Sequence, residues 1–154
     1  MKIVYRVFVG LGVLFCLFAA LAFYLSFSSA QFVSNQTQFI SDFTQDFSEN
    51  WEVSDVYERL DNNLILEFKK PQGAEALSHF AALGSLSNIS DITMERYNEG
   101  TNGTVAVLTY KAIFQNAKSV ITIQLVKLDD SVKVQGFYIT PEDGFPNQLT
   151  KHEA

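Results

Sequence analysis

Cysteine is almost missing from this sequence of 154 residues, which has one, at position 16. The part after residue 30 has none, which excludes disulfides and thiolate metal sites as sources of stability there. Proline is scarce as well, with three in the chain, and tryptophan occurs once. The C-terminal part therefore depends on an apolar core and on backbone hydrogen bonds for its stability.

Acidic side chains are absent from the first 41 residues, and all 17 carboxylates follow them. Lys2 and Arg6 precede residues 7–27, which are almost continuously apolar. A helix of that length spans about 30 Å, the thickness of a hydrocarbon core. The run is also longer than the apolar core of a secretory signal, which has roughly 7–15 residues. We therefore expect residues 1–30 to be a retained membrane anchor.

Cleavage of this segment is the alternative reading. Residues 28–30 form a small-x-small site (Ser-Ser-Ala) after which a signal peptidase could cut. For a retained anchor, Lys2 and Arg6 predict a cytoplasmic N-terminus, because positive residues stay on the cytoplasmic side. The following domain is then expected outside the cytoplasm.

Small residues recur every four positions within the apolar run, at Gly12, Cys16 and Ala20. Such a stripe can form a contact face between transmembrane helices. The simpler interpretation, which we favour, is that transmembrane helices are rich in glycine and alanine in any case.

Basic surface is also lacking. Without Lys2 and Arg6, 9 Lys and Arg residues face 17 Asp and Glu residues, which gives the part after residue 30 a net charge of −8. Its largest basic cluster is the pair Lys69 and Lys70. A nucleic acid needs basic surface that displaces its counterions, so we expect no nucleic-acid partner and no adhesion to anionic lipid.

Helical patterns dominate the first part of this acidic region. Phe39, Phe43 and Phe47 recur every four residues, with Ile40 and Trp51 beside them, and predict a helix over residues 34–50.

Three weaker patterns follow this helix. Asp55 and Glu58 have the spacing of a capping box that opens a second short helix. Residues 64–68 fit either a helical turn or a short strand. Pro71 and Gly84 mark the start and the stop of a further helix.

The hydrophobic period then changes to two. Four segments rich in β-branched and aromatic residues predict strands over residues 92–97, 104–114, 119–128 and 132–139. The connections have hairpin length, so we expect an antiparallel meander. The predicted fold class is α+β, with two or three helices on a curved four-stranded sheet over residues 31–140 and a flexible polar tail over residues 141–154.

This order of elements, ending in Val-Gln-Gly-Phe-Tyr-Ile at residues 134–139, resembles the cystatin-like or nuclear-transport-factor-2-like roll. The chain looks similar to small exported bacterial members of that superfamily, over residues 34–140. The resemblance implies a cone-shaped cavity between sheet and helices, which holds a ligand in some members. In others, such as the bitopic scaffold subunits of type IV secretion systems, it implies a protein-assembly surface. No catalytic residue of the ketosteroid isomerases in this superfamily maps onto the chain.

A search for catalytic residues finds no cluster with the spacing of a metal site or an active site. His79 and His152 are isolated, and we interpret His79 as a surface or half-buried histidine rather than a base. Asp129 and Asp130 fit a solvated turn. For Glu95 we expect an ion pair with Arg96 or Lys111 rather than catalysis. We therefore expect a non-enzymatic protein without a metal or cofactor, and an isomerase-like activity is the alternative.

Aromatic side chains are the most distinctive feature of the domain's composition, at 14% of the whole chain. The candidates for lining a ligand pocket are Phe43, Trp51, Tyr57, Phe80, Tyr97, Tyr110 and Tyr138. The simpler interpretation is that most of these rings form the core.

Two functional hypotheses follow. The first is a non-enzymatic scaffold or protein-interaction domain, anchored by one helix in a bacterial inner membrane and facing the periplasm, with a protein partner or a second copy. The second is a domain that binds a small hydrophobic ligand, or acts as an isomerase, in an aromatic cavity. If the N-terminal segment is cleaved near Ala30, the domain would be secreted to the periplasm.

Overall fold

The computed structural model describes residues 2–146, and for residues 2–15 and 25–28 it describes the backbone alone. The chain divides into two compact units, Met1–Asn35 and Gln36–Ala154. His152 and most of the predicted polar tail lie outside the described residues.

Helix α1 (Lys2–Asn50) contains the apolar run. Its stretch Cys16–Asn50 is long and apolar enough to cross a membrane, judged by length and composition. Large apolar side chains here expose more than half of their surface, namely Leu17, Phe18, Leu21, Phe23 and Tyr24. Because these positions surround the helix axis, this part of α1 has no polar face that would suit water.

The helix predicted over residues 34–50 is confirmed, but it does not start at residue 34, because α1 continues without a break through residues 28–34. Ser28, Ser29 and Ala30 are therefore helical, although their spacing fits a cleavage site. No proline or glycine interrupts residues 13–50, so the backbone has no local reason to leave the helix.

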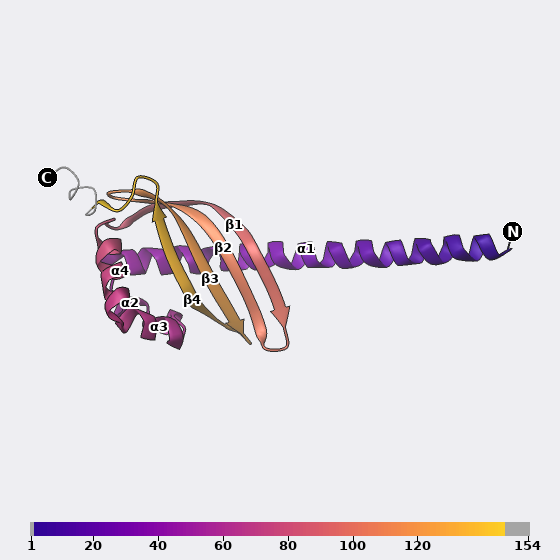
Figure 1. Ribbon diagram of the computed structural model, residues 1–154, viewed down its shortest axis with the longest axis horizontal. Coiled ribbons are helices and arrows are strands. Elements are labelled where there is room, and N and C mark those ends of the chain that lie inside the picture. Colours follow the sequence, from indigo (N-terminus) through magenta and orange to yellow (C-terminus); the bar gives the residue numbers. More distant parts are fainter. Residues whose placement is uncertain (1, 147–154) are drawn as a thin grey trace. The chain divides into compact units, whose positions relative to one another are not determined.

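An α+β unit follows (Figure 1). Short helices come first: α2 (Val53–Val56), the 3₁₀ turn η1 (Tyr57–Arg59), α3 (Asn62–Lys69) and α4 (Pro71–Ala81). Four strands come next, β1 (Leu86–Gly100), β2 (Gly103–Phe114), β3 (Lys118–Leu128) and β4 (Ser131–Pro141). The sheet is antiparallel with the order β1-β2-β3-β4, which confirms the predicted meander.

Within the second unit, the last four turns of α1 form the centre of the core. Ile40, Phe43 and Phe47 are fully buried, and they share one face with Thr44 and Ser48. The inward positions of β2 and β3 alternate with outward ones and cover this face, at Ala106, Leu108, Tyr110, Ala112, Ile121, Ile123 and Leu125.

Two polar contacts fix α1 against the rest of the unit, at Thr44 and at Ser48. The Thr44 and Tyr110 hydroxyls lie 2.8 Å apart, and Thr44 Oγ1 donates to the Ile40 carbonyl at 2.8 Å. Ser48 Oγ accepts the Leu86 N–H at 2.9 Å, at the start of β1. The buried hydroxyls of Thr44, Ser48 and Tyr110 therefore have partners, which avoids the cost of unsatisfied polar groups.

The helix ends at Trp51, whose φ of 57° is left-handed. Its N–H still donates to the Phe47 carbonyl at 2.8 Å, and its indole Nε1 donates to the Gly84 carbonyl at 3.1 Å. A left-handed non-glycine residue costs roughly 1–2 kcal/mol, which the buried indole and its hydrogen bond offset. Trp51 thus closes the core at the point where α4 turns into β1.

The structure corrects two details of the short helices. The capping box at Asp55 is wrong, because Asp55 lies inside α2 and the residue that precedes the helix is Glu52. The ambiguous residues 64–68 are helical, since Asp61 caps α3 by accepting the Asn63 N–H at 2.9 Å. The helix that starts at Pro71 is confirmed.

The first strand is longer than predicted. β1 starts at Leu86 and contains three register shifts against β2. Asp91, next to one of them, has a φ of 54°. These bulges disturb the alternation of apolar and polar residues along β1. The two-residue hydrophobic period therefore identified only the middle of this strand, residues 92–97.

Gly73 allows α3 and α4 to meet at a sharp corner. A Cβ at this position would lie against the Glu67 carbonyl oxygen and 2.6 Å from the Phe68 Cα, so backbone atoms would have to move. Glycine is therefore required here by close approach rather than by its φ angle.

We predict that Gly73→Ala lowers the free energy of unfolding by about 2 kcal/mol, because the backbone overlap outweighs the better helix propensity of alanine. Urea unfolding of the full chain in detergent, followed by Trp51 fluorescence, measures it. Gly100→Ala is the control, since its new Cβ meets nothing closer than 4.0 Å. Equal stability of both variants would contradict the close approach.

Candidate functional site

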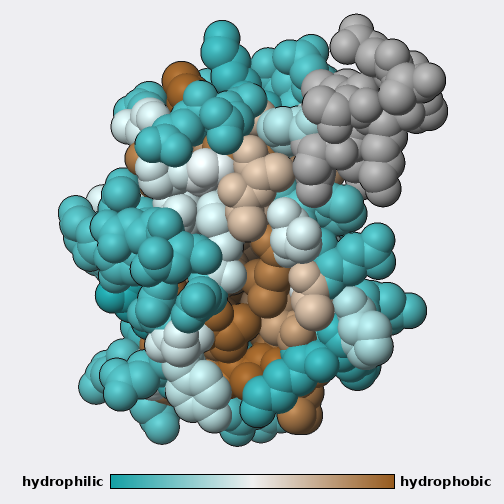
Figure 2. All heavy atoms as spheres, turned by 90° about the vertical axis from the view of Figure 1, so that its left-hand side faces the viewer, coloured by the Kyte–Doolittle hydropathy of each residue, from teal (hydrophilic) through white to brown (hydrophobic). Residues whose placement is uncertain are grey.

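An apolar groove lies between the helix pair α3–α4 and strand β4. Two adjoining hollows of about 320 Å³ each form it, and both are lined by Ala76, Phe80 and Tyr138. The first continues along α3 past Leu64 and Phe68. Figure 2 shows this side of the molecule, where a recessed apolar strip runs between hydrophilic borders.

The sequence builds this groove from both of its walls. Leu64 and Phe68 are spaced by four residues and lie on one face of α3, and Ala76 and Phe80 do the same on α4. The opposite wall is β4, where Phe137 points inward and Tyr138 points outward. Tyr138 exposes 67% of its surface, although it borders the apolar strip.

The chain itself closes each end of the groove. At one end Leu60 forms a parallel bridge with Val134, and the Asp61 N–H donates to the Val134 carbonyl at 2.8 Å. At the other end the Phe145 ring lies 5.4 Å from the His79 ring and 6.2 Å from the Phe80 ring, centroid to centroid. The apolar strip between these two closures stays at the surface.

Charge around the groove is sparse. Glu67 lines the first hollow and pairs with Lys70 at 2.5 Å. His79 lines the second hollow, and its Nε2 lies 3.8 Å from a Glu75 carboxylate oxygen. Both carboxylates are well exposed, so these pairs contribute little to stability. The groove therefore offers apolar contact with a weakly acidic border.

The seven predicted pocket residues do not form one site. Phe43, Trp51 and Tyr110 are buried in the core, while Phe80 and Tyr138 line the groove. Tyr57 is 53% exposed in η1, and the Tyr97 hydroxyl donates to Glu99 at 3.1 Å on β1. Sequence reasoning missed the groove residues Leu64, Phe68 and Ala76, although their spacing of four residues, or their place on the helix that Pro71 opens, was visible.

Aromatic rings occupy the space between α1 and the sheet. Phe137 contacts Phe43 and Phe47 at centroid distances of 5.4 and 5.7 Å. Trp51 lies 5.5 Å from Phe114 and 5.6 Å from Phe80. These separations are those of rings in direct contact, so the core side chains fill this space themselves.

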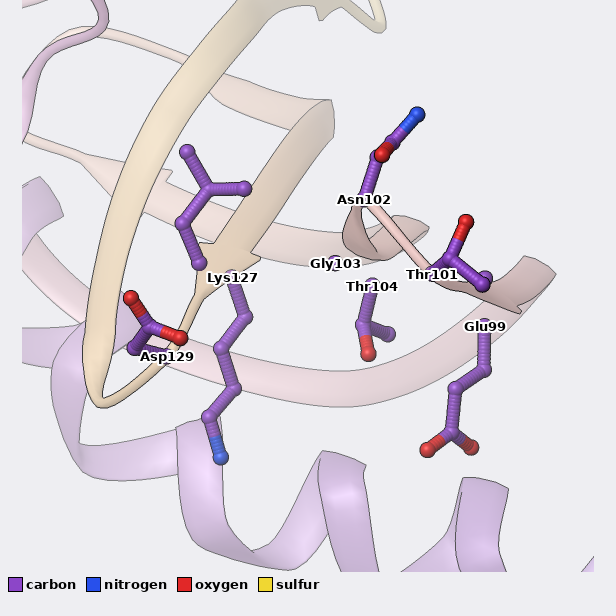
Figure 3. Close-up of a pocket in the computed structure, with 9 residues that line it drawn as sticks. Glu99, Thr101, Asn102, Gly103, Thr104, Lys127 and Asp129 are labelled. Carbon is purple, nitrogen blue, oxygen red and sulfur yellow. The ribbon is translucent and has the colours of Figure 1, made fainter.

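A polar hollow of about 610 Å³ lies at the opposite ends of the strands, between the β1–β2 and β3–β4 turns. Figure 3 shows that Glu99 and Lys127 extend to the same side there, whereas Asn102 points away. Asp129 lies in its turn with a φ of 52°, which confirms the solvated turn. Among the described residues no group of three or more metal-ligating side chains occurs.

The expected ion pair of Glu95 with Arg96 or Lys111 is wrong, because Glu95 forms neither pair among the described residues. Lys111 pairs with Asp91 at 2.9 Å, and this hydrogen bond raises the pKa of the lysine. Glu95 instead accepts a hydrogen bond from Thr109 Oγ1 at 2.9 Å. The bulge between positions 90 and 93 shifts the register and explains the exchange of partners.

The predicted contact face of the membrane helix stays a prediction. Cys16 and Ala20 are exposed on α1. Gly12 lies in the helical stretch of which the structure describes the backbone alone.

Comparison with known proteins gives no relative. No family model, no curated protein and no solved structure matches the chain. The resemblance to a cystatin-like or nuclear-transport-factor-2-like roll therefore stays a prediction.

Tyr110 provides a test of the closed core. Burial raises the pKa of its hydroxyl above the ordinary value of 10.0, and the hydrogen bond to Thr44 offsets part of that rise. A raised pKa in the folded state means that folding favours the protonated hydroxyl of Tyr110. The contribution of Tyr110 to the free energy of unfolding is therefore complete below pH 10 and falls as the pH increases above it.

We predict that wild-type protein loses more stability between pH 9 and about pH 11 than Tyr110→Phe does. At neutral pH the variant should be about 1 kcal/mol less stable, because the hydrogen bond is lost. Urea unfolding at a series of pH values measures both effects. Tyr57→Phe is the control at an exposed position. Identical pH profiles for wild type and Tyr110→Phe would contradict a closed core around Tyr110.

Proposed function

We propose that this chain is a membrane-anchored protein that acts through protein contacts of its C-terminal domain, and that it is not an enzyme. The anchor is residues 1–30, with the N-terminus in the cytoplasm and the domain outside it, in the envelope of a bacterium. The proposal combines a place in the membrane with a surface for a partner.

The anchor is supported by the apolar part of α1. Its side chains from Leu17 to Tyr24 are exposed and apolar on every side of the helix, which suits lipid better than water. Lys2 and Arg6 are the cations before it, and the positive-inside rule gives the orientation. The length of the helix favours retention over cleavage after Ala30.

The proposal of a protein contact is supported by the place of the apolar side chains, in the interior and in the surface groove. The interior between α1 and the sheet is packed with rings, so a ligand there would have to displace the core. The apolar groove, by contrast, lies on the surface between α4 and β4. Exposed apolar strips with polar borders are typical of protein interaction sites.

A small hydrophobic ligand is the second candidate, and the groove is the feature that favours it. Each hollow, at about 320 Å³, is near the lower limit of ligand pockets, roughly 300 Å³. Both are shallow and partly open along β4, whereas ligand pockets usually enclose most of the ligand. A protein surface therefore fits the groove better.

Crosslinking of the full chain in its native membrane tests the proposal. A lysine-reactive crosslinker followed by mass spectrometry should give one defined adduct, either with a partner protein or with a second copy. The chain should also stay in the membrane after alkaline carbonate extraction. A domain that remains uncrosslinked at every reagent length, or a chain that is released by carbonate, would contradict the proposal.

A further inference from the structure

We propose that the groove beside β4 accepts an extended segment of a partner protein, which adds to the sheet as a fifth strand. The segment carries apolar side chains at alternate positions and no net negative charge. This inference rests on the proposed function and names the site and the chemistry of the partner.

The chain begins this fifth strand itself. β4 pairs with β3 on one side, and among residues 2–146 its outer edge forms a backbone bridge at Val134 only. Leu60 makes that bridge, and the next residue donates its N–H to the Val134 carbonyl. The chain then turns into α3 at Asn62 and leaves the edge. Leu60 therefore occupies the position of a fifth strand for one residue pair, with Val134, and the chain leaves this position empty along the rest of β4.

The vacated position runs along the apolar groove. The strand residues that border the two hollows lie between Gln135 and Thr140. Six residues of an extended chain span about 20 Å, at about 3.3 Å per residue. A strand about 4.8 Å from β4 would direct every second side chain into the space beside Ala76 and Phe80. This spacing is the reason for apolar side chains at alternate positions.

The other edge of the sheet is unsuited to the same role. β1 has three register shifts and carries exposed charges at Asp91, Glu95, Arg96 and Glu99. Bulges and charged side chains are the usual protection of an edge strand against pairing. β4 has one register shift, at Gln135, and its following residues pair with β3 in regular register up to Pro141. β4 is thus the edge that can accept a strand.

The charge of the groove selects the partner. Among the residues that the structure describes, Glu67 is the one carboxylate that lines it, and the part of the chain after residue 30 carries a net charge of −8. An acidic segment would be repelled by this domain, whereas a neutral or basic one would be attracted.

A selection with a defined probe tests the inference. A phage-displayed library of random octapeptides is selected on the full chain in lipid nanodiscs, and the enriched peptides are measured against three proteins. These are the wild type, Ala76→Trp, which fills the groove, and Ala74→Trp, which places the same side chain at an exposed position of α4 outside it. Ala76→Trp should weaken binding at least tenfold, and Ala74→Trp should leave it within twofold.

The backbone of the enriched peptide gives the second readout. N-methylation should abolish binding at alternate residues only, since one side of an added strand faces β4 and the other faces solvent. The inference would be overturned by peptides that bind Ala76→Trp as well as wild type, by peptides with helical spacing of their apolar residues, or by an absence of enrichment. Trp51 fluorescence of both variants in urea confirms that they are folded.

The two proposals can fail separately. A defined crosslinked partner without any groove-dependent peptide would leave the proposed function intact and overturn the strand site. Groove-dependent peptides without a crosslinked partner in the native membrane would support the site and contradict the proposed function.

Discussion

The contact of Phe47 with four other rings is the interaction on which the second unit depends. Its centroid lies 5.4–6.0 Å from those of Phe43, Trp51, Phe68 and Phe137. These rings come from α1, from its C-terminal end, from α3 and from β4. One fully buried side chain therefore joins the central helix, the short helices and the edge strand. Burial of one such ring contributes about 2–3 kcal/mol, and its aromatic contacts add to this.

This packing explains why the apolar groove lies at the surface and not inside the core. The rings of α1 pack against the inner side of the sheet, and the hydroxyls of Thr44, Ser48 and Tyr110 bond to one another or to the backbone. The groove begins where α3 and α4 leave the sheet, because Leu60 bridges β4 for one residue and the chain then turns away. The apolar residues of the groove thus form the outer boundary of the core. They lie beside the edge of β4, which the chain leaves uncovered after the bridge at Val134.

Much of the fold could be predicted because its signals are local. The phenylalanine spacing on α1, proline at the start of α4 and hairpin turns between β-branched segments each depend on a few neighbouring residues. The continuity of α1 and the bulges of β1 were missed, since nothing in the sequence around residues 28–34 or 90–96 marks them by periodicity.

The site was predicted less well. Phe80 and Tyr138 were identified as candidates, but so were Phe43 and Tyr110, and an aromatic residue looks the same in a core and in a groove. Whether such a residue lies in the core or in the groove depends on contacts between α4 and β4, which are almost sixty residues apart in the sequence. The bridge between Leu60 and Val134 likewise joins distant segments, and no local pattern indicates it.

Substitution of Phe47 by alanine tests the central claim most directly, with Phe39→Ala as the matched control. Phe39 lies two turns earlier on the same helix and is partly exposed, and its ring stacks on that of Phe43 at 6.4 Å. Urea unfolding of the full chain in detergent, followed by Trp51 fluorescence, should show a loss of about 3–5 kcal/mol for Phe47→Ala. Phe39→Ala should lose about 1 kcal/mol. Equal losses for both variants would contradict the account, because Phe47 would then contribute no more than a ring at the border of the core.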